Sequence, residues 1–73
     1  MNLETAFGKV LRGRREAASL TQTALAEQSG LHTTFVSLLE RGERQPSLAT
    51  LFALAKALDV EPEDLVREVR ECA

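Results

Sequence analysis

Apolar residues recur three or four positions apart along most of the chain, which is the spacing of one face of an α-helix. Five segments show it: residues 3–18, 21–29, 33–40, 48–58 and 62–71. No segment alternates apolar and polar residues as a half-buried strand does. The pattern therefore predicts an all-α fold, a compact five-helix bundle in which residues 1–73 form a single domain.

Residues suited to helix ends stand where these segments begin and end. Asn2, Thr21 and Ser47 have side-chain oxygens that can accept a hydrogen bond from the first turn of a helix. Gly30 and Gly42 follow the second and third segments, and glycine tolerates the left-handed conformation in which many helices end. These signals support the same five helices.

The apolar positions also predict the core. The expected core residues are Phe7, Leu25, Val36, Leu39, Phe52 and Leu58. Leu3 belongs to the apolar stripe of the first helix, and the fourth segment, which starts at Leu48, has the widest apolar face, so we expect its helix to lie centrally. Gly8 and Gly13 lower helix propensity. Close approach of another helix would explain Gly8, and the sequence offers no reason for Gly13.

Residues 21–42 contain two short helices joined by a tight turn at Gly30. Helices this short are marginal on their own, so the rest of the bundle must hold them. One face of the second helix is apolar. The other face, or its edge, carries Thr33, Thr34, Ser37 and Leu38. Two helices in this arrangement can present the second one to the major groove of duplex DNA.

The net charge of −2 argues against nucleic acid as a partner until its distribution is considered. Residues 1–58 hold seven basic and five acidic side chains, whereas residues 59–73 hold two basic and six acidic ones. The basic residues expected beside the helix pair are Lys9, Arg12, Arg14, Arg15, Arg41 and Arg44. We therefore expect a basic surface there, and an acidic C-terminal helix that points away from any phosphate backbone.

Few residues are suited to chemistry. One histidine, His32, and one distant cysteine, Cys72, do not make a metal site or an internal disulfide. No paired nucleophile and base, no paired carboxylates and no phosphate-binding loop are evident, so we expect no catalytic residues, no metal and no cofactor. No segment resembles a membrane span or a signal peptide. We expect a soluble cytoplasmic protein that does not bind membranes.

Four stretches in the right order resemble the phage repressor and Cro class of helix-turn-helix regulators, often called XRE-type. They are FGKVLRGRRE, LTQTALAEQSGL, VSLLERGERQPSL and LFALAKALDV. The resemblance covers nearly the whole chain and implies a lambda repressor-like DNA-binding domain. It also implies a sequence-specific transcriptional regulator whose recognition helix, about residues 33–40, lies in the major groove.

The resemblance and the charge pattern together predict a set of residues that contact DNA. They are Gln22, Thr33, Thr34, Ser37, Leu38, Arg12, Arg15, Arg41 and Arg44. Gln22 matches a glutamine that in the family usually grips a phosphate and braces the recognition helix. Arg15 and Glu40 match a partly buried salt bridge that ties the first helix to the end of the third. Where relatives often have a Ser or Thr cap, this chain has His32, so either Thr33 takes over the capping or His32 meets a phosphate.

The residues expected to face the bases are unusual. Two threonines and a leucine can contact thymine methyl groups or offer single hydrogen bonds. They lack the bidentate geometry with which arginine recognises guanine and glutamine recognises adenine. Sequence preference is therefore expected to lean on DNA shape, and on Arg41 or Arg44 at the backbone.

One recognition helix buries too little surface to be specific, whereas a homodimer places two of them about 34 Å apart on one face of the duplex. We expect the interface on the fifth helix, at Leu65, Val66 and Val69, aided by the end of the fourth helix, with Leu65 also closing the core. Without a separate small-molecule ligand domain, concentration would be the control signal, as in controller proteins, antitoxins and compact phage repressors. The alternative is a protein-interaction module or antitoxin-like protein that keeps the fold and binds a partner such as a toxin.

Overall fold

The computed structural model describes residues 1–73 and contains five α-helices and no strand. The helices are α1 (Leu3–Ala17), α2 (Gln22–Ser29), α3 (Thr33–Glu40), α4 (Leu48–Ala57) and α5 (Pro62–Cys72). The predicted all-α, five-helix architecture is confirmed, and the predicted bounds differ from the observed ones only at helix ends.

Local sequence signals explain where the helices begin and end. Three of them start at the predicted caps, where the side-chain oxygens of Asn2, Thr21 and Ser47 accept backbone N–H groups three residues on at 2.8 to 3.0 Å. Gly30 ends α2 with φ 72°, and Gly42 follows α3 with φ 75°. Both glycines therefore occupy the left-handed region that disfavours side chains.

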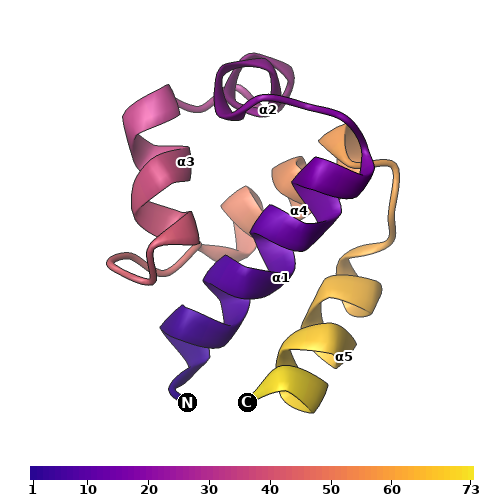
Figure 1. Cartoon of the computed structure of the whole chain (residues 1–73). Coiled ribbons are helices and arrows are strands. Elements are labelled where there is room, and N and C mark those ends of the chain that lie inside the picture. The colour runs from indigo at the N-terminus through magenta and orange to yellow at the C-terminus, as the bar shows by residue number, and fades with distance from the viewer.

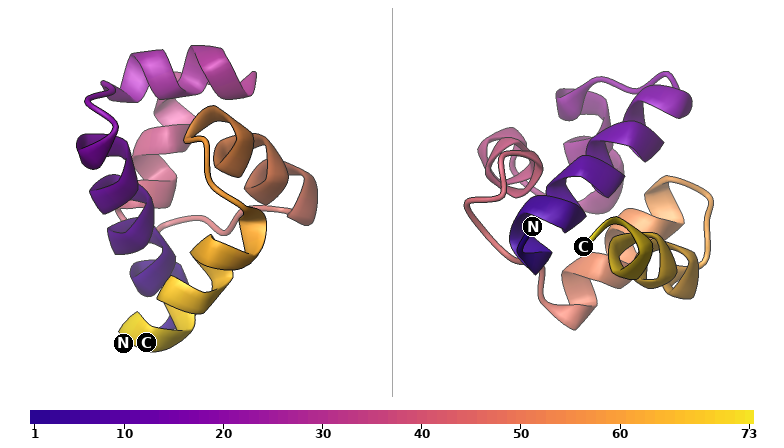
Figure 2. Two further views of the ribbon diagram at one scale, coloured as in Figure 1. Left: turned by 90° about the vertical axis from the view of Figure 1, so that its right-hand side faces the viewer. Right: turned by 60° about the horizontal axis from the view of Figure 1, so that its bottom comes forward.

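Helix α1 runs through the middle of the molecule, with α3 on one side of it and α5 on the other (Figure 1). Helix α2 crosses one end of the bundle and leads by a short turn into α3, while α4 packs against α2 and α5 (Figure 2). The N- and C-termini lie side by side in every view, and the Sγ of Cys72 is 3.7 Å from the Sδ of Met1.

The core consists of two apolar clusters. The larger one contains Phe7, Leu11, Leu25, Ala26, Val36, Leu39, Leu54 and Leu58. The smaller one joins α1, α4 and α5 through Val10, Ala55 and Leu65. Each fully buried aliphatic side chain contributes roughly 1.5 to 3 kcal/mol, so these clusters are the main force that holds the short helices together. Apart from Phe52, the predicted core residues are confirmed.

The predicted central position of α4 is wrong. Phe52 is 55% exposed, Leu48 is 71% exposed and, on α1, Leu3 is 62% exposed. Helix α4 buries Leu54 and Ala55 against its neighbours, but no element of the chain covers its outer side. It therefore lies at the edge of the bundle, and α1 holds the central position (Figure 1).

The contact between α1 and α3 is close because Gly8 has no side chain. A Cβ atom at Gly8 would stand 2.5 Å from the carbonyl oxygen of Glu40 and 2.6 Å from that of Leu39. The predicted close approach is confirmed. At Gly13 nothing lies within 4 Å of the same atom, so packing does not explain that glycine. The C-terminal end of α3 is thus held directly against the backbone of α1.

Candidate nucleic-acid interface

Helix α3 is buried on one face and open on the other. Val36 and Leu39 are fully buried, which fixes the rotation of the helix about its axis. The four residues predicted to face bases lie outside this buried stripe: Thr33 and Thr34 are exposed, and Ser37 and Leu38 are half-buried. The described fold therefore leaves the N-terminal half of α3 accessible.

The start of α3 differs from the prediction. His32 is the N-cap residue and makes no side-chain capping bond, so the expected capping by Thr33 is wrong. Other hydroxyl groups of the chain are engaged, as where Ser29 donates to the carbonyl of Leu25 at 2.6 Å. None of the hydrogen bonds within the chain uses the hydroxyl of Thr33, Thr34 or Ser37, so these groups are free to meet a ligand.

Arg15 and Glu40 form the predicted salt bridge. Arg15 Nε lies 2.6 Å from Glu40 Oε2 and Arg15 Nη2 lies 3.0 Å from Glu40 Oε1, with the side chains only 12% and 4% exposed. Arg15 Nη1 donates to the carbonyl oxygen of Leu20 at 2.9 Å. The hydrogen bond to Glu40 raises the pKa of Arg15, so its guanidinium group stays charged. All three guanidinium nitrogens are used internally, and Arg15 is therefore not placed on the surface as the predicted DNA contact.

Gln22 joins the same network. Its Nε2 donates to Glu40 Oε1 at 3.0 Å, which links the first residue of α2 to the last residue of α3. In this respect Gln22 braces α3 as the resemblance implied, while its contact with a phosphate stays a prediction. Three helices therefore converge on the carboxylate of Glu40.

The exposed cations near α3 have weak internal partners. Arg12 pairs with Glu16 at 3.2 Å and Arg41 pairs with Glu43 at 3.3 Å, all four side chains being exposed. Arg44 donates to a backbone carbonyl at 3.1 Å. Such surface pairs are worth about 0 to 1 kcal/mol and are easily exchanged for a phosphate. The guanidinium groups of Arg12, Arg41 and Arg44 are thus available.

Arg14 points to the opposite side of α1 from Arg15. It forms a two-pronged ion pair with Glu68 of α5, in which Nε lies 3.1 Å from Oε1. The hydrogen bond to Glu68 raises the pKa of Arg14. Because 54 residues separate the partners, the sequence contained no local signal for this pair. The predicted basic residues of α1 therefore face different surroundings: Arg12 faces the solvent, Arg15 faces the interior and Arg14 faces α5.

The acidic residues of the C-terminal part lie away from α3, as predicted. They are Asp59, Glu61, Glu63, Asp64, Glu68 and Glu71, in and just before α5. Since α5 and α3 flank opposite sides of α1, these carboxylates do not crowd the open face of α3 (Figure 1).

A family model described as helix-turn-helix matches residues 11–65, which are most of the chain and include α2 and α3. The chain belongs to the helix-turn-helix family.

Three relatives show how far the likeness of this helix-turn-helix protein extends. Control protein C.SmaI from Serratia marcescens is 41% identical over 69 residues, 93% of this chain and 82% of that protein. The crystal structure of the restriction-modification controller protein C.AhdI from Aeromonas hydrophila has a TM-score of 0.82 and 46% identity, covering 84% of this chain and 92% of that one. The DNA-binding domain of the P22 C2 repressor has a TM-score of 0.82 and 35% identity, with coverages of 90% and 86%. The predicted family is confirmed.

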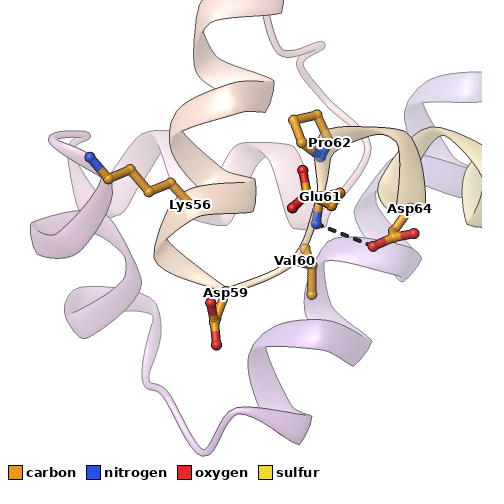
Figure 3. Close-up of a pocket in the computed structure, with 6 residues that line it drawn as sticks. All are labelled: Lys56, Asp59, Val60, Glu61, Pro62 and Asp64. Carbon is orange, nitrogen blue, oxygen red and sulfur yellow. Dashed lines mark hydrogen bonds between the residues drawn. The ribbon is translucent and has the colours of Figure 1, made fainter.

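A polar hollow lies where α4 leads into α5 of the helix-turn-helix protein (Figure 3). Its lining residues are Lys56, Asp59, Val60, Glu61, Pro62 and Asp64. Asp64 accepts the backbone N–H of Glu61 at 3.2 Å and a bond from Arg67 at 2.9 Å, and the bond from Arg67 is the larger cause that lowers the pKa of Asp64. The side chain of Lys56 points away from Asp64 in Figure 3. These polar groups organise the start of α5.

No group of three or more His, Cys, Asp or Glu residues lies close enough to hold a metal ion. None of the five helices is both long enough and apolar enough to span a bilayer.

An apolar groove of about 380 Å³ lies between α1, α4 and α5. Its apolar lining includes Leu3, Phe7, Leu51, Val66 and Val69. The prediction that Leu65 forms part of a dimer interface is wrong, because Leu65 is fully buried against Val10 and Ala55 within the chain. Val66 is exposed, and Val69 packs partly on the core.

Most of this exposed apolar surface was not predicted from the sequence. Leu48 and Phe52 stand one turn apart on α4 and flank Leu51 of the groove. Their periodic spacing is the same as that of core residues, so the sequence signal could not separate an interface from the interior.

Proposed function

We propose that this protein is a sequence-specific transcriptional regulator that binds duplex DNA as a homodimer, with α3 of each subunit in the major groove. The observation that carries the proposal is the open face of α3 at Thr33 and Thr34, on a helix held firmly by Gly8 and Glu40. A rigid helix with a free N-terminal half suits base recognition, since the N-terminal residues of a recognition helix contact base edges. We accordingly propose that the protein acts in the cytoplasm.

Phosphate contacts would come from Gln22 and from the exposed arginines beside α3, Arg41 and Arg44, with Arg12 further along α1. Replacement of their surface partners by phosphates supplies affinity without sequence preference and makes binding dependent on salt. Arg15 acts indirectly in this scheme, because it positions α3 through Glu40.

The second copy of the chain would sit on the apolar groove and on Leu48, Phe52 and Val66 beside it. A stable interface needs about 800 Å² from each partner, which is about a fifth of the 4431 Å² surface of this chain. The exposed apolar residues named above would supply the apolar part of that area. The chain measures 28 × 23 × 22 Å, and α3 and α5 lie on opposite sides of α1. Two copies joined on the α5 side are thus of a size to hold their α3 helices about one DNA turn, about 34 Å, apart.

The likeness to control protein C.SmaI, to the controller protein C.AhdI and to the DNA-binding domain of the P22 C2 repressor supports the same function. With these relatives in mind, we infer that the protein regulates transcription from the DNA it binds.

Selection of binding sites from a random duplex library, followed by fluorescence anisotropy, tests the proposal. The selected duplex should bind more tightly than random DNA, and its affinity should fall steeply with salt. Thr34→Ala should weaken binding to the selected duplex only, and Arg44→Ala should weaken binding to all duplexes. Glu71→Gln on α5 serves as the control and should change neither. Failure to enrich any duplex would overturn the proposal in favour of a protein-binding module.

A further inference from the structure

We propose that α3 distinguishes base pairs chiefly through the 5-methyl group of pyrimidines, so that the preferred site contains thymines that 5-methylcytosine can replace. The inference rests on the proposed function, because it concerns which feature of the major groove α3 would contact. It follows from what the open face of the helix carries and from where the other polar groups of the chain are engaged.

The open face of α3 carries methyl groups and hydroxyls. Thr33 and Thr34 are exposed, Leu38 is half-buried, and each presents at least one methyl group. Ser37 adds a hydroxyl. A hydroxyl both donates and accepts a hydrogen bond, so it can bond to any base and discriminates little. Methyl groups contact the thymine C5-methyl, which no other unmodified base presents in the major groove.

Groups that could recognise a base by two hydrogen bonds are engaged elsewhere. The amide of Gln22 donates to Glu40, and the guanidinium of Arg15 is held by Glu40 and a backbone carbonyl. His32 is exposed, but its two ring nitrogens lie on different sides of the ring and cannot form a fork to one base.

Of the free guanidinium groups, that of Arg41 is nearest to α3 along the chain, just beyond its C-terminal end. At 1.5 Å per residue it is roughly 12 Å along the helix axis from Thr33. Arg41 is therefore suited to a phosphate or to the edge of the site, and the N-terminal half of α3 meets the bases without amide, guanidinium or carboxylate groups.

This composition makes the methyl group the distinguishing feature of the bases that α3 covers. Uracil lacks it and should be discriminated against, although it pairs as thymine does. Cytosine methylated at C5 presents it at the same place, and the hydroxyls of Thr33 and Thr34 can meet either the acceptor of thymine or the donor of cytosine.

The test uses the selected duplex with single thymines replaced by uracil. At positions under α3 each replacement should weaken binding about fourfold, the factor for one buried methyl group. Replacement of thymine by uracil at positions that neither α3 helix covers is the control and should have no effect on affinity. Cytosine at a sensitive position should weaken binding, and 5-methylcytosine should restore much of it.

Two substitutions separate the methyl group from the hydroxyl on the protein side. Thr34→Ser keeps the hydroxyl and should reduce the preference for thymine over uracil at one position. Thr34→Val keeps the methyl group, replaces the hydroxyl with a second methyl group and should retain that preference. Thr33→Ser and Thr33→Val form a second pair for the neighbouring base, and thermal unfolding verifies that all four variants are folded.

Equal affinity for the thymine and uracil duplexes at every position would overturn the inference. So would an unchanged preference in the variant that combines Thr33→Ser, Thr34→Ser and Leu38→Ala. In either case selective binding of the enriched duplex would still support the proposed regulator. Failure of the regulator itself would be recognised earlier, because no duplex would be enriched.

Discussion

Gly8 of α1 lies so close to Glu40 of α3 that a Cβ atom at Gly8 would stand 2.5 Å from the carbonyl oxygen of Glu40. This backbone contact holds one end of α3, and the Arg15–Glu40 salt bridge holds the same end through side chains. These contacts at the C-terminal end of α3 therefore determine the position of its open face, although Thr33 and Thr34 lie at the other end of the helix.

Gly8→Ala should destabilise the protein, because the added methyl group overlaps the carbonyl oxygens of Leu39 and Glu40 and the helices must separate. Overpacking of this kind costs about 1 to 3 kcal/mol. Gly13→Ala is the matched control: its Cβ meets nothing within 4 Å, so it should stabilise the helix by up to about 1 kcal/mol. Urea unfolding measures both, and equal effects of the two variants would contradict the packing argument.

Arg15→Ala or Glu40→Ala should each reduce the free energy of unfolding by about 3 to 5 kcal/mol, because each leaves a nearly buried charge without its partner. The double variant Arg15→Met with Glu40→Leu should recover much of the loss, since it removes both charges together. Denaturant unfolding of this double variant and of the single variants Arg15→Met and Glu40→Leu completes a double-mutant cycle that gives the coupling energy. Additive losses would show that the two side chains do not depend on each other.

Asp64→Asn should make the protein less sensitive to acid. The bond from Arg67 and the backbone N–H of Glu61 lower the pKa of Asp64 from 3.8 in the folded state. A carboxyl group with a lowered folded-state pKa stabilises above its unfolded-state pKa, and this contribution is lost as the pH falls through the folded value. Urea unfolding from pH 5 down to about pH 2.5 should therefore show a shallower loss for Asp64→Asn, with Glu63→Gln as the control. An equal loss of unfolding free energy with falling pH in Asp64→Asn and the unsubstituted protein would contradict a stabilising role of the Asp64 carboxylate.

Phe52→Asp combined with Val66→Asp should prevent the proposed homodimer, because charges on an exposed apolar face oppose its burial. Both side chains are exposed in the monomer, so helix content and cooperative unfolding should be kept. Sedimentation at micromolar concentration, with and without the selected duplex, measures the result. An unsubstituted protein that sediments alone only as an 8.0 kDa species, and that adds only one copy per selected duplex, would refute the dimer.

Helix positions were predictable because their signals are local. Caps such as Asn2, Thr21 and Ser47 and the left-handed Gly30 act within a few residues, and the three-to-four spacing records which side of a helix is apolar. The salt bridge of Arg15 with Glu40 was foreseen only through the family resemblance.

Two of the predictions that failed concern Phe52 and Leu65, which have equivalent apolar spacing but opposite environments. Leu65 meets Val10 and Ala55, whereas the outer side of α4 around Phe52 meets no other element. Spacing shows that a face is apolar and does not show what covers it.

The sequence by itself determined the five helices, their ends and the helix-turn-helix layout, because these depend on contacts between residues close along the chain. Only the tertiary structure decided which of Arg12, Arg14 and Arg15 faces solvent, α5 or Glu40, and which apolar face is left uncovered. Those outcomes depend on how helices far apart in sequence pack together. Packing of that kind is set by the shape and volume of side chains at each contact, as the missing Cβ of Gly8 illustrates.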